Sequence, residues 1–171
     1  MEKLDSVDKK ILAILQTNGR ITNAQLAKEL SLSPSPTLER VKKLEQAGII
    51  RKYVALVDGL KVNRNTTAFV SVSLDRLSDN VMKTFDRQIT QLDEVQECYS
   101  IAGEYDYLLK VTVSDLEEYN HFWHHKLSKI KGIHNIKTSF VLTSHKQETA
   151  LPVQNMDIQG SETGKRRNGS K

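Results

Sequence analysis

Residues 21–48, ITNAQLAKELSLSPSPTLERVKKLEQAG, contain two predicted helices joined by a very short polar turn. Thr22 and Gln25 have the spacing of a capping box, in which each side chain accepts the backbone N–H of the other at the start of a helix. The turn falls at Ser31 and Leu32. Two helices at this spacing predict a helix-turn-helix, whose second helix enters the major groove of DNA.

The second helix has sequence signals at both ends. Ser33 can cap its first turn, Pro34 suits its first position, and Gly48 is the expected stop. We expect its hydroxyl and cationic side chains to contact DNA: Ser33, Ser35, Thr37, Arg40, Lys42 and Lys43. The hydroxyls and the helix N-terminus would hold phosphates, Arg40 would reach a phosphate or a base edge, and the lysines would act mainly through charge. Alternatively, Arg40 pairs with Glu39 or with an acid of the first helix.

Two flanking segments complete a small DNA-binding domain. Residues 5–18 carry apolar side chains at a 3.6-residue period, which predicts the third helix that such a module needs to bury a core. Residues 49–57, IIRKYVALV, predict a strand or short hairpin, the wing of a winged helix. The competing interpretation is a small helical bundle with an ordinary solvated basic face. We expect a winged helix-turn-helix domain over residues 1–58.

Residues 67–150 predict a second domain. Strands and helices alternate in it as follows: strand 68–74, helix 81–92, strands 95–102 and 107–113, helix 116–130 and strand 133–143. The order β-α-β-β-α-β is that of a ferredoxin-like fold, so the fold class is α+β. Residues 59–66 fit a linker, and the basic segment 151–171 lacks apolar periodicity and is expected to be a disordered tail.

The composition is that of an ordinary soluble protein of 171 residues, 38% hydrophobic and 27% charged. No apolar run approaches the roughly 20 residues of a membrane helix, and the acidic N-terminus does not resemble a signal peptide. The net charge of +4 is concentrated in residues 1–58 and 151–171, which supports nucleic-acid binding only together with the motif. The single cysteine, Cys98, excludes an intramolecular disulfide. We expect it in the core, and we expect the protein in a reducing cytoplasm.

Residues 103–107, GEYDY, form a glycine turn that carries acidic and aromatic side chains. Its carboxylates could bind an ammonium group, and its tyrosines could contact an apolar side chain. The alternatives are a surface hairpin whose tyrosines pack on a neighbouring subunit, and an Asp106 that braces the turn by accepting backbone N–H bonds. His121 and His125 have the spacing to share a metal, but no carboxylate completes the site. We therefore expect a solvated helix face there and no metal.

The chain resembles the Lrp/AsnC family, also called feast/famine regulatory proteins, and is most similar to its leucine-responsive branch. The likeness extends over residues 4–148 and is carried by these segments: LDSVDKKIL at 4–12, NGR at 18–20, LSPSPTLERV at 32–41, GII at 48–50, EC at 97–98 and GEYDYLL at 103–109. The resemblance implies a transcriptional regulator that binds double-stranded DNA. It also implies homodimers that assemble into homo-octamers through the ferredoxin-like domain, with a small amino acid bound between dimers.

In this family the glycine turn and the start of the last strand line the effector site, which implies these residues: Gly103, Glu104, Tyr105, Asp106, Thr138 and Ser139. An aliphatic or sulfur-containing amino acid would fill the pocket. Glu104 stands where aspartate is common in the family, and the basic tail is longer than usual. Sirohaem decarboxylases are similar in fold, so an enzyme of that kind is the alternative function. The sequence has no recognisable nucleophile, phosphate loop or metal set, so we expect no enzyme and no cofactor.

Overall fold

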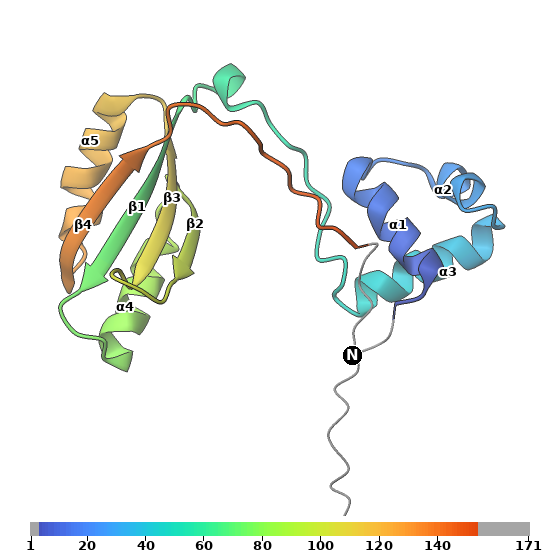
Figure 1. Cartoon of the computed structure of the whole chain (residues 1–171), viewed down its shortest axis with the longest axis horizontal. Helices are drawn as coiled ribbons and strands as arrows, with labels where there is room; N and C mark the ends of the chain where they lie inside the picture. Colours follow the sequence, from blue (N-terminus) through green and yellow to red (C-terminus); the bar gives the residue numbers. More distant parts are fainter. Residues whose placement is uncertain (1–3, 154–171) are drawn as a thin grey trace, which may run out of the picture. The chain divides into compact units, whose positions relative to one another are not determined.

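The computed structural model describes residues 4–153, which form two compact units (Figure 1). One unit comprises residues 4–55 together with 147–153, and the other comprises residues 56–146. Within the described residues, no helix is both long and apolar enough to cross a lipid bilayer.

The first unit is built from three helices, as predicted. They are α1 (Ser6–Thr17), α2 (Asn23–Glu29) and α3 (Pro34–Gln46). The predicted capping box is confirmed, because Gln25 N donates to Thr22 Oγ1 and Thr22 N donates to Gln25 Oε1, both at 3.2 Å. Gly48 follows α3 with a φ of +69°, a left-handed conformation that favours glycine, so the predicted helix stop is also confirmed.

A small apolar core lies between these helices. Ile11 and Leu12 of α1 are buried with Leu26 of α2 and Leu44 of α3. In the turn between α2 and α3, Ser31 adopts a left-handed conformation with a φ of +55°, which helps to reverse the chain within a few residues. The short turn brings α3 back against α2 and α1.

One charged contact joins α3 to the start of α1. Arg40 Nη1 donates to Asp5 Oδ2 at 2.6 Å and to Asp8 Oδ1 at 2.7 Å. Asp5 also caps α1 by accepting the backbone N–H of Asp8, and this bond, together with Arg40, lowers the pKa of Asp5. The guanidinium therefore links the two helices through a pair of carboxylates.

The chain returns to the first unit at its C-terminal end. The side-chain amide of Gln16 on α1 pairs with the main chain of Leu151, and Val153 packs against the helical core. The prediction of a disordered tail over residues 151–171 is therefore wrong at its start, because residues 151–153 make specific contacts. The remaining residues, 154–171, lie outside the described part of the chain.

The strand or hairpin predicted over residues 49–57 is wrong. Residues 51–58 have no regular secondary structure, and several of their apolar side chains are exposed: Tyr53, Val54, Leu56 and Val57. A strand needs a neighbour for its backbone hydrogen bonds, and no strand in residues 4–153 pairs with this segment. Composition indicated a preference for extended backbone but could not supply the partner strand.

The second unit has the predicted β-α-β-β-α-β order. Its elements are β1 (Thr66–Leu74), α4 (Asp79–Ile89), β2 (Val95–Ser100), β3 (Tyr107–Val113), α5 (Leu116–His125) and β4 (Ile133–Phe140). The strands form one antiparallel sheet in the order β2-β3-β1-β4 (Figure 1). A short 3-10 helix, η1 (Gly59–Val62), lies within the predicted linker.

Alternation along β1 separates a covered face of the sheet from an open one. Val70 and Val72 are fully buried with Phe85 of α4 and Phe122 of α5. Phe69 points to the other face and is exposed. Both helices of this unit lie against the first face, and no helix or strand of residues 56–146 covers the second (Figure 1).

The last helix is shorter than the predicted range 116–130. A 3-10 turn, η2 (Leu127–Lys129), replaces its final part. Phe122 and Leu127 are both fully buried, yet a continuous α-helix would place them about 140° apart around its axis. The break at Lys126 turns Leu127 toward the core, so packing overrides the uninterrupted helical pattern.

The predicted core position of Cys98 is wrong, because this residue is exposed on β2. It lies opposite Leu109 of β3, which is fully buried. β2 is an edge strand, so its side chains on the helix side are only partly covered. The position of a strand within the sheet decides this difference, and the local sequence does not encode it.

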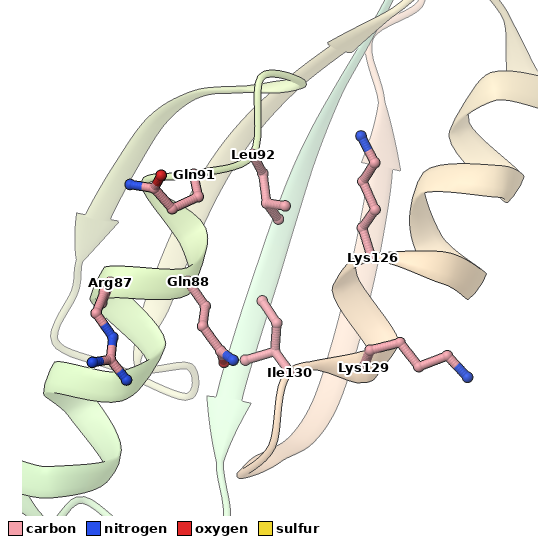
Figure 2. Close-up of a pocket in the computed structure, with 7 residues that line it drawn as sticks. All are labelled: Arg87, Gln88, Gln91, Leu92, Lys126, Lys129 and Ile130. Carbon is pink, nitrogen blue, oxygen red and sulfur yellow. The ribbon is translucent and has the colours of Figure 1, made fainter.

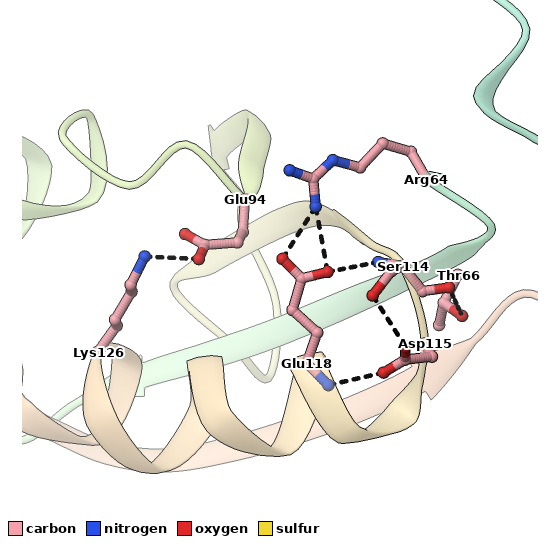
Figure 3. Close-up of polar contacts among 7 residues, drawn as sticks. All are labelled: Arg64, Thr66, Glu94, Ser114, Asp115, Glu118 and Lys126. Atoms are coloured by element: carbon pink, nitrogen blue, oxygen red, sulfur yellow. Dashed lines mark hydrogen bonds and ion pairs between the residues drawn. The ribbon is translucent and has the colours of Figure 1, made fainter. Parts of the chain in front are cut away.

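Polar contacts hold the start of α5 (Figure 3). Asp115 caps the helix by accepting Glu118 N, and Glu118 in turn accepts the backbone N–H of Ser114 at 2.6 Å. Arg64, which precedes β1, donates to both oxygens of Glu118 at 2.9 and 3.1 Å. These donors, Ser114 foremost, lower the pKa of Glu118 to about 2. The carboxylate therefore joins the segment before β1 to the start of α5.

Replacing Arg40 with alanine should lower the free energy of unfolding of the first unit by about 0.5–1 kcal/mol, because its ion pairs are partly exposed. Amide hydrogen exchange in α1 and α3 should become faster. The fluorescence of Trp123, the single tryptophan, reports the second unit and should not change. Arg40→Lys keeps the positive charge, so it should lower the free energy of unfolding by less than Arg40→Ala does. Wild-type exchange rates in Arg40→Ala would contradict the stabilising role.

Acid should weaken the second unit through Glu118. Its folded pKa of about 2 lies below the ordinary value of 4.5, so its contribution is complete above pH 4.5 and is lost as the pH falls toward 2. Denaturation curves followed by Trp123 fluorescence should therefore show a decline in stability over this window. Glu118→Gln should be less stable at neutral pH and should decline less steeply. Parallel pH profiles for the two proteins would refute this role.

Candidate functional site

The exposed face of α3 is the candidate DNA interface. Exposed side chains that share one side of the helix by their spacing are Ser35, Leu38, Glu39, Lys42 and Gln46. The opposite side packs into the core through Leu44. Because a helix that enters the major groove presents only one side to the bases, the phase of α3 decides which residues are available.

Thr37 is not available to DNA, so its predicted contact is wrong. The residue is fully buried, and its hydroxyl donates to the Ser33 carbonyl at 2.9 Å. This bond satisfies the hydroxyl within the helix and allows it to lie in an apolar core. Thr37 therefore contributes to the fold of the interface and not to its surface.

Arg40 pairs with acids, as the alternative interpretation expected, and these acids lie at the start of α1. Both Asp5 and Asp8 hold its guanidinium, as described above. A contact with DNA would require this side chain to leave one or both carboxylates. Arg40 therefore positions α3, and its contact with a base or phosphate stays a prediction.

The N-terminus of α3 offers few backbone donors. Pro34 and Pro36 have no N–H, and the N–H of Thr37 points to the Ser33 carbonyl, so Ser35 supplies the one N–H in the first three helical positions. The predicted side-chain cap by Ser33 is wrong, because its hydroxyl makes no capping bond. Ser33 and Ser35 are both exposed, so hydroxyl groups outnumber backbone amides as donors for a phosphate here.

Lys42 and Lys43 are exposed on the C-terminal half of α3, where side chains acting through charge were expected. The sequence analysis missed Leu38 and Glu39, which lie on the exposed side. The sequence analysis selected only hydroxyl and cationic side chains as DNA contacts, so it gave no reason to choose a leucine or a glutamate. The seven-residue spacing of apolar Leu44 from Thr37 carried the missing signal, because it indicates which side is buried.

The second candidate site is the turn between β2 and β3. Ile101 N donates to the Asp106 carbonyl at 2.9 Å and closes the turn. Gly103 has a φ of +152°, where other residues are strained, although no neighbouring atom would obstruct a side chain there. Gly103 and Glu104 are exposed, while Tyr105 and Asp106 are half-buried.

Asp106 braces this turn, which is the alternative interpretation of its role. Its Oδ2 accepts the backbone N–H of Leu74 at 2.8 Å, and its own N–H donates to the Val72 carbonyl at 3.0 Å. Both partners lie at the end of β1. The residue therefore attaches the turn to the central part of the sheet, whether or not its carboxylate also contacts a ligand.

Thr138 and Ser139 lie on opposite faces of β4. Thr138 faces the helices, where its hydroxyl bonds with the Tyr119 hydroxyl of α5 at 2.5 Å. Ser139 pairs with Phe69 and shares the open face of the sheet. The two hydroxyls therefore cannot contact the same small ligand from one subunit.

The turn and the two hydroxyls are also separated within one chain. Tyr107, at the end of the turn, lies opposite Val72, whereas Thr138 lies opposite Val70 on the other side of β1. Two strand spacings across the sheet are about 10 Å, and the offset along the strands adds about 7 Å. The structure thus does not bring all six predicted effector residues together in one subunit.

A hollow of about 600 Å³ lies elsewhere, between α4 and the region of η2 (Figure 2). Its lining residues are Arg87, Gln88, Gln91, Leu92, Lys126, Lys129 and Ile130. None of the predicted effector residues lines it. The Lys126 ammonium is engaged by Glu94 Oε1 at 2.6 Å, and the Lys129 side chain extends away from the hollow (Figure 2). We therefore do not assign this hollow to an amino acid.

The histidines of α5 stack on one another. The rings of His121 and His125 are 4.5 Å apart, and both residues are exposed. Among residues 4–153, no group of three histidine, cysteine, aspartate or glutamate side chains could hold a metal ion. The predicted solvated helix face accounts for both residues.

Comparison with known proteins assigns a family to each of the two units. Residues 4–51 match the family model described as winged helix-turn-helix DNA-binding, and residues 67–151 match the Lrp/AsnC ligand binding domain. The leucine-responsive regulatory protein of Escherichia coli is 37% identical over 150 residues. The match covers 88% of this chain and 92% of that protein.

Solved structures give the same result. A transcriptional regulator of Neisseria meningitidis in complex with L-Met has a TM-score of 0.85 and 40% identity, and the match covers 88% of this chain and 97% of that one. An AsnC family transcriptional regulator of Agrobacterium tumefaciens has a TM-score of 0.85 and 38% identity. The match covers 90% of this chain and 99% of that one. Since two domain matches, full-length relatives and the fold all agree, the chain belongs to the Lrp/AsnC family of DNA-binding transcriptional regulators with an amino-acid ligand-binding domain.

Proposed function

We propose that this regulator binds DNA as a symmetric assembly and responds to an aliphatic or sulfur-containing amino acid. Near-complete coverage of the leucine-responsive relative and of the L-Met-bound regulator carries this proposal. The match covers 92% of the first protein's length. The protein acts on DNA and not as an enzyme, and its site of action is the cytoplasm that the sequence analysis predicts.

The exposed side of α3 enters the major groove in this proposal. Ser33 and Ser35 hold phosphates near the helix start, and Lys42 and Lys43 add charge further along. Leu38, which is 42% exposed, has the apolar character that contacts the methyl group of thymine. Arg40 keeps the helix at its correct angle through α1.

The open face of the sheet is the proposed dimer contact. Phe69 and Tyr99 are exposed, and Leu108 lies beside Tyr99 on the same face. Lys110 on β3 pairs with Glu97 on β2 at 2.9 Å, which places a neutralised ion pair among these apolar groups. A face with this composition is typical of an isologous two-fold contact, and further contacts would assemble dimers into an octamer.

The effector site is proposed to lie between subunits, because one chain does not bring its parts together. The turn of one subunit supplies Gly103, Glu104 and Tyr105, with Asp106 holding the turn in shape. Another subunit supplies hydroxyls from Thr138 or Ser139. Glu104 is exposed, and its carboxylate is suited to bind an α-ammonium group.

Lys42→Ala should weaken binding to all DNA sequences and should lower the salt dependence of the affinity by about one unit of slope. Leu38→Ala should instead reduce affinity for the preferred operator by about 1 kcal/mol and leave non-specific binding unchanged. Gel-shift titrations at several salt concentrations measure both effects. Lys129→Ala, a charge-matched change in the second unit, is the control. Equal losses for Lys42→Ala and Lys129→Ala would remove α3 from the interface.

Asp106→Ala should destabilise the second unit by about 1–3 kcal/mol without any amino acid, because the buried Leu74 N–H loses its acceptor. Asp106→Asn retains an acceptor oxygen and is the matched control. Thermal-shift assays of Asp106→Asn with L-leucine and L-methionine then test whether the negative charge of Asp106 is needed to bind the amino acid. If Asp106→Asn is stable and shows the wild-type thermal shift with the amino acid, the ammonium contact belongs to Glu104. Glu104→Gln should then lose the amino-acid-induced thermal shift. Wild-type stability of Asp106→Ala would refute the bracing role.

A further inference from the structure

Residues 147–153, which we call the C-terminal clasp, belong to the DNA-binding unit although they follow the ligand-binding domain in sequence. Gln16 Nε2 donates to the Leu151 carbonyl at 3.0 Å, and Leu151 N donates to Gln16 Oε1 at 2.6 Å. A glutamine side chain carries the same amide group as the backbone. This pair of bonds therefore reproduces one step of an antiparallel strand pairing.

The neighbouring residues support this docking. Leu151 precedes Pro152, and a residue before proline is restricted to extended conformations, so the clasp loses little entropy when it pairs with Gln16. Val153 then packs against the core that contains Ile11 and Leu26. The Leu151 side chain itself is 72% exposed, so the main chain and Val153 carry the contact.

The clasp is connected directly to β4. Phe140 ends that strand opposite Ala68, and Val141 N donates to the Thr67 carbonyl at 2.9 Å. The segment that enters β1 and the segment that leaves β4 therefore meet the sheet at the same corner. Residues 141–150 have no regular secondary structure, and they connect β4 along the chain to Leu151.

We propose that the C-terminal clasp transmits the state of the ligand-binding domain to the DNA-binding unit. Two chain segments connect the units, and both attach to the sheet where β1 and β4 pair, so a change at the end of β4 can be carried along the chain to the clasp. Thr138 and Ser139 immediately precede the end of β4. A ligand bound to either residue would therefore contact the strand from which the chain continues to the clasp. This inference rests on the proposed function for its regulatory part and on the Gln16–Leu151 contact for its structural part.

Three variants test the structural part in the full chain. Gln16→Ala removes both bonds, and Leu151→Pro removes the N–H donor, whereas Leu151→Ala keeps the main-chain bonds and is the matched control. In hydrogen-exchange mass spectrometry, residues 147–153 should exchange about tenfold faster in the first two variants than in wild type. Leu151→Ala should resemble wild type. Exchange of this segment at the rate of an unstructured peptide in the wild-type protein would overturn the clasp.

The regulatory part is measured as the ratio of DNA affinities with and without saturating L-methionine or L-leucine. Gln16→Ala and Leu151→Pro should bring this ratio to within about twofold of one, while calorimetric affinity for the amino acid and DNA affinity without it remain at wild-type values. Leu151→Ala should keep the wild-type ratio. A wild-type ratio in Gln16→Ala would overturn the coupling. A wild-type protein that binds no DNA or no amino acid would instead overturn the proposed function, and the exchange measurement would still decide the clasp.

Discussion

The antiparallel pairing of β1 with β4 is the constraint on which the second unit and its connections depend. Val70 lies opposite Thr138, and Ala68 lies opposite Phe140, so the last strand completes the sheet against the first. This pairing extends the apolar face that α4 and α5 cover. It also fixes the corner at which both connecting segments meet the sheet, because their attachment points are neighbours across one pair of strands.

In the first unit, stability and recognition use different sides of α3. Thr37 and Leu44 are buried, and their burial leaves Ser35 and Lys42 on the exposed side. Arg40 lies between these sides and contacts the acids of α1. The helix can present a defined surface to DNA because its other side is held by apolar packing and by this charged contact.

Several polar side chains that suggested ligand binding already have partners within the protein. Asp106 accepts the Leu74 N–H, and Thr138 shares a hydrogen bond with Tyr119. Buried polar groups must be satisfied in the folded state, so internal partners are formed before any ligand arrives. One subunit therefore has fewer free donors and acceptors for a ligand than its residue types suggested.

The sequence by itself determined the features that depend on near neighbours along the chain. Capping residues, glycine stops and alternating apolar residues predicted three helices and the β-α-β-β-α-β order, because these signals act over a few residues. Tertiary structure decided what depends on distant neighbours. Within residues 4–153 no strand pairs with the segment 49–57, Cys98 is exposed on an edge strand, and Thr37 is buried in the core. Burial is set by which other element covers a residue, and no local pattern contains that information.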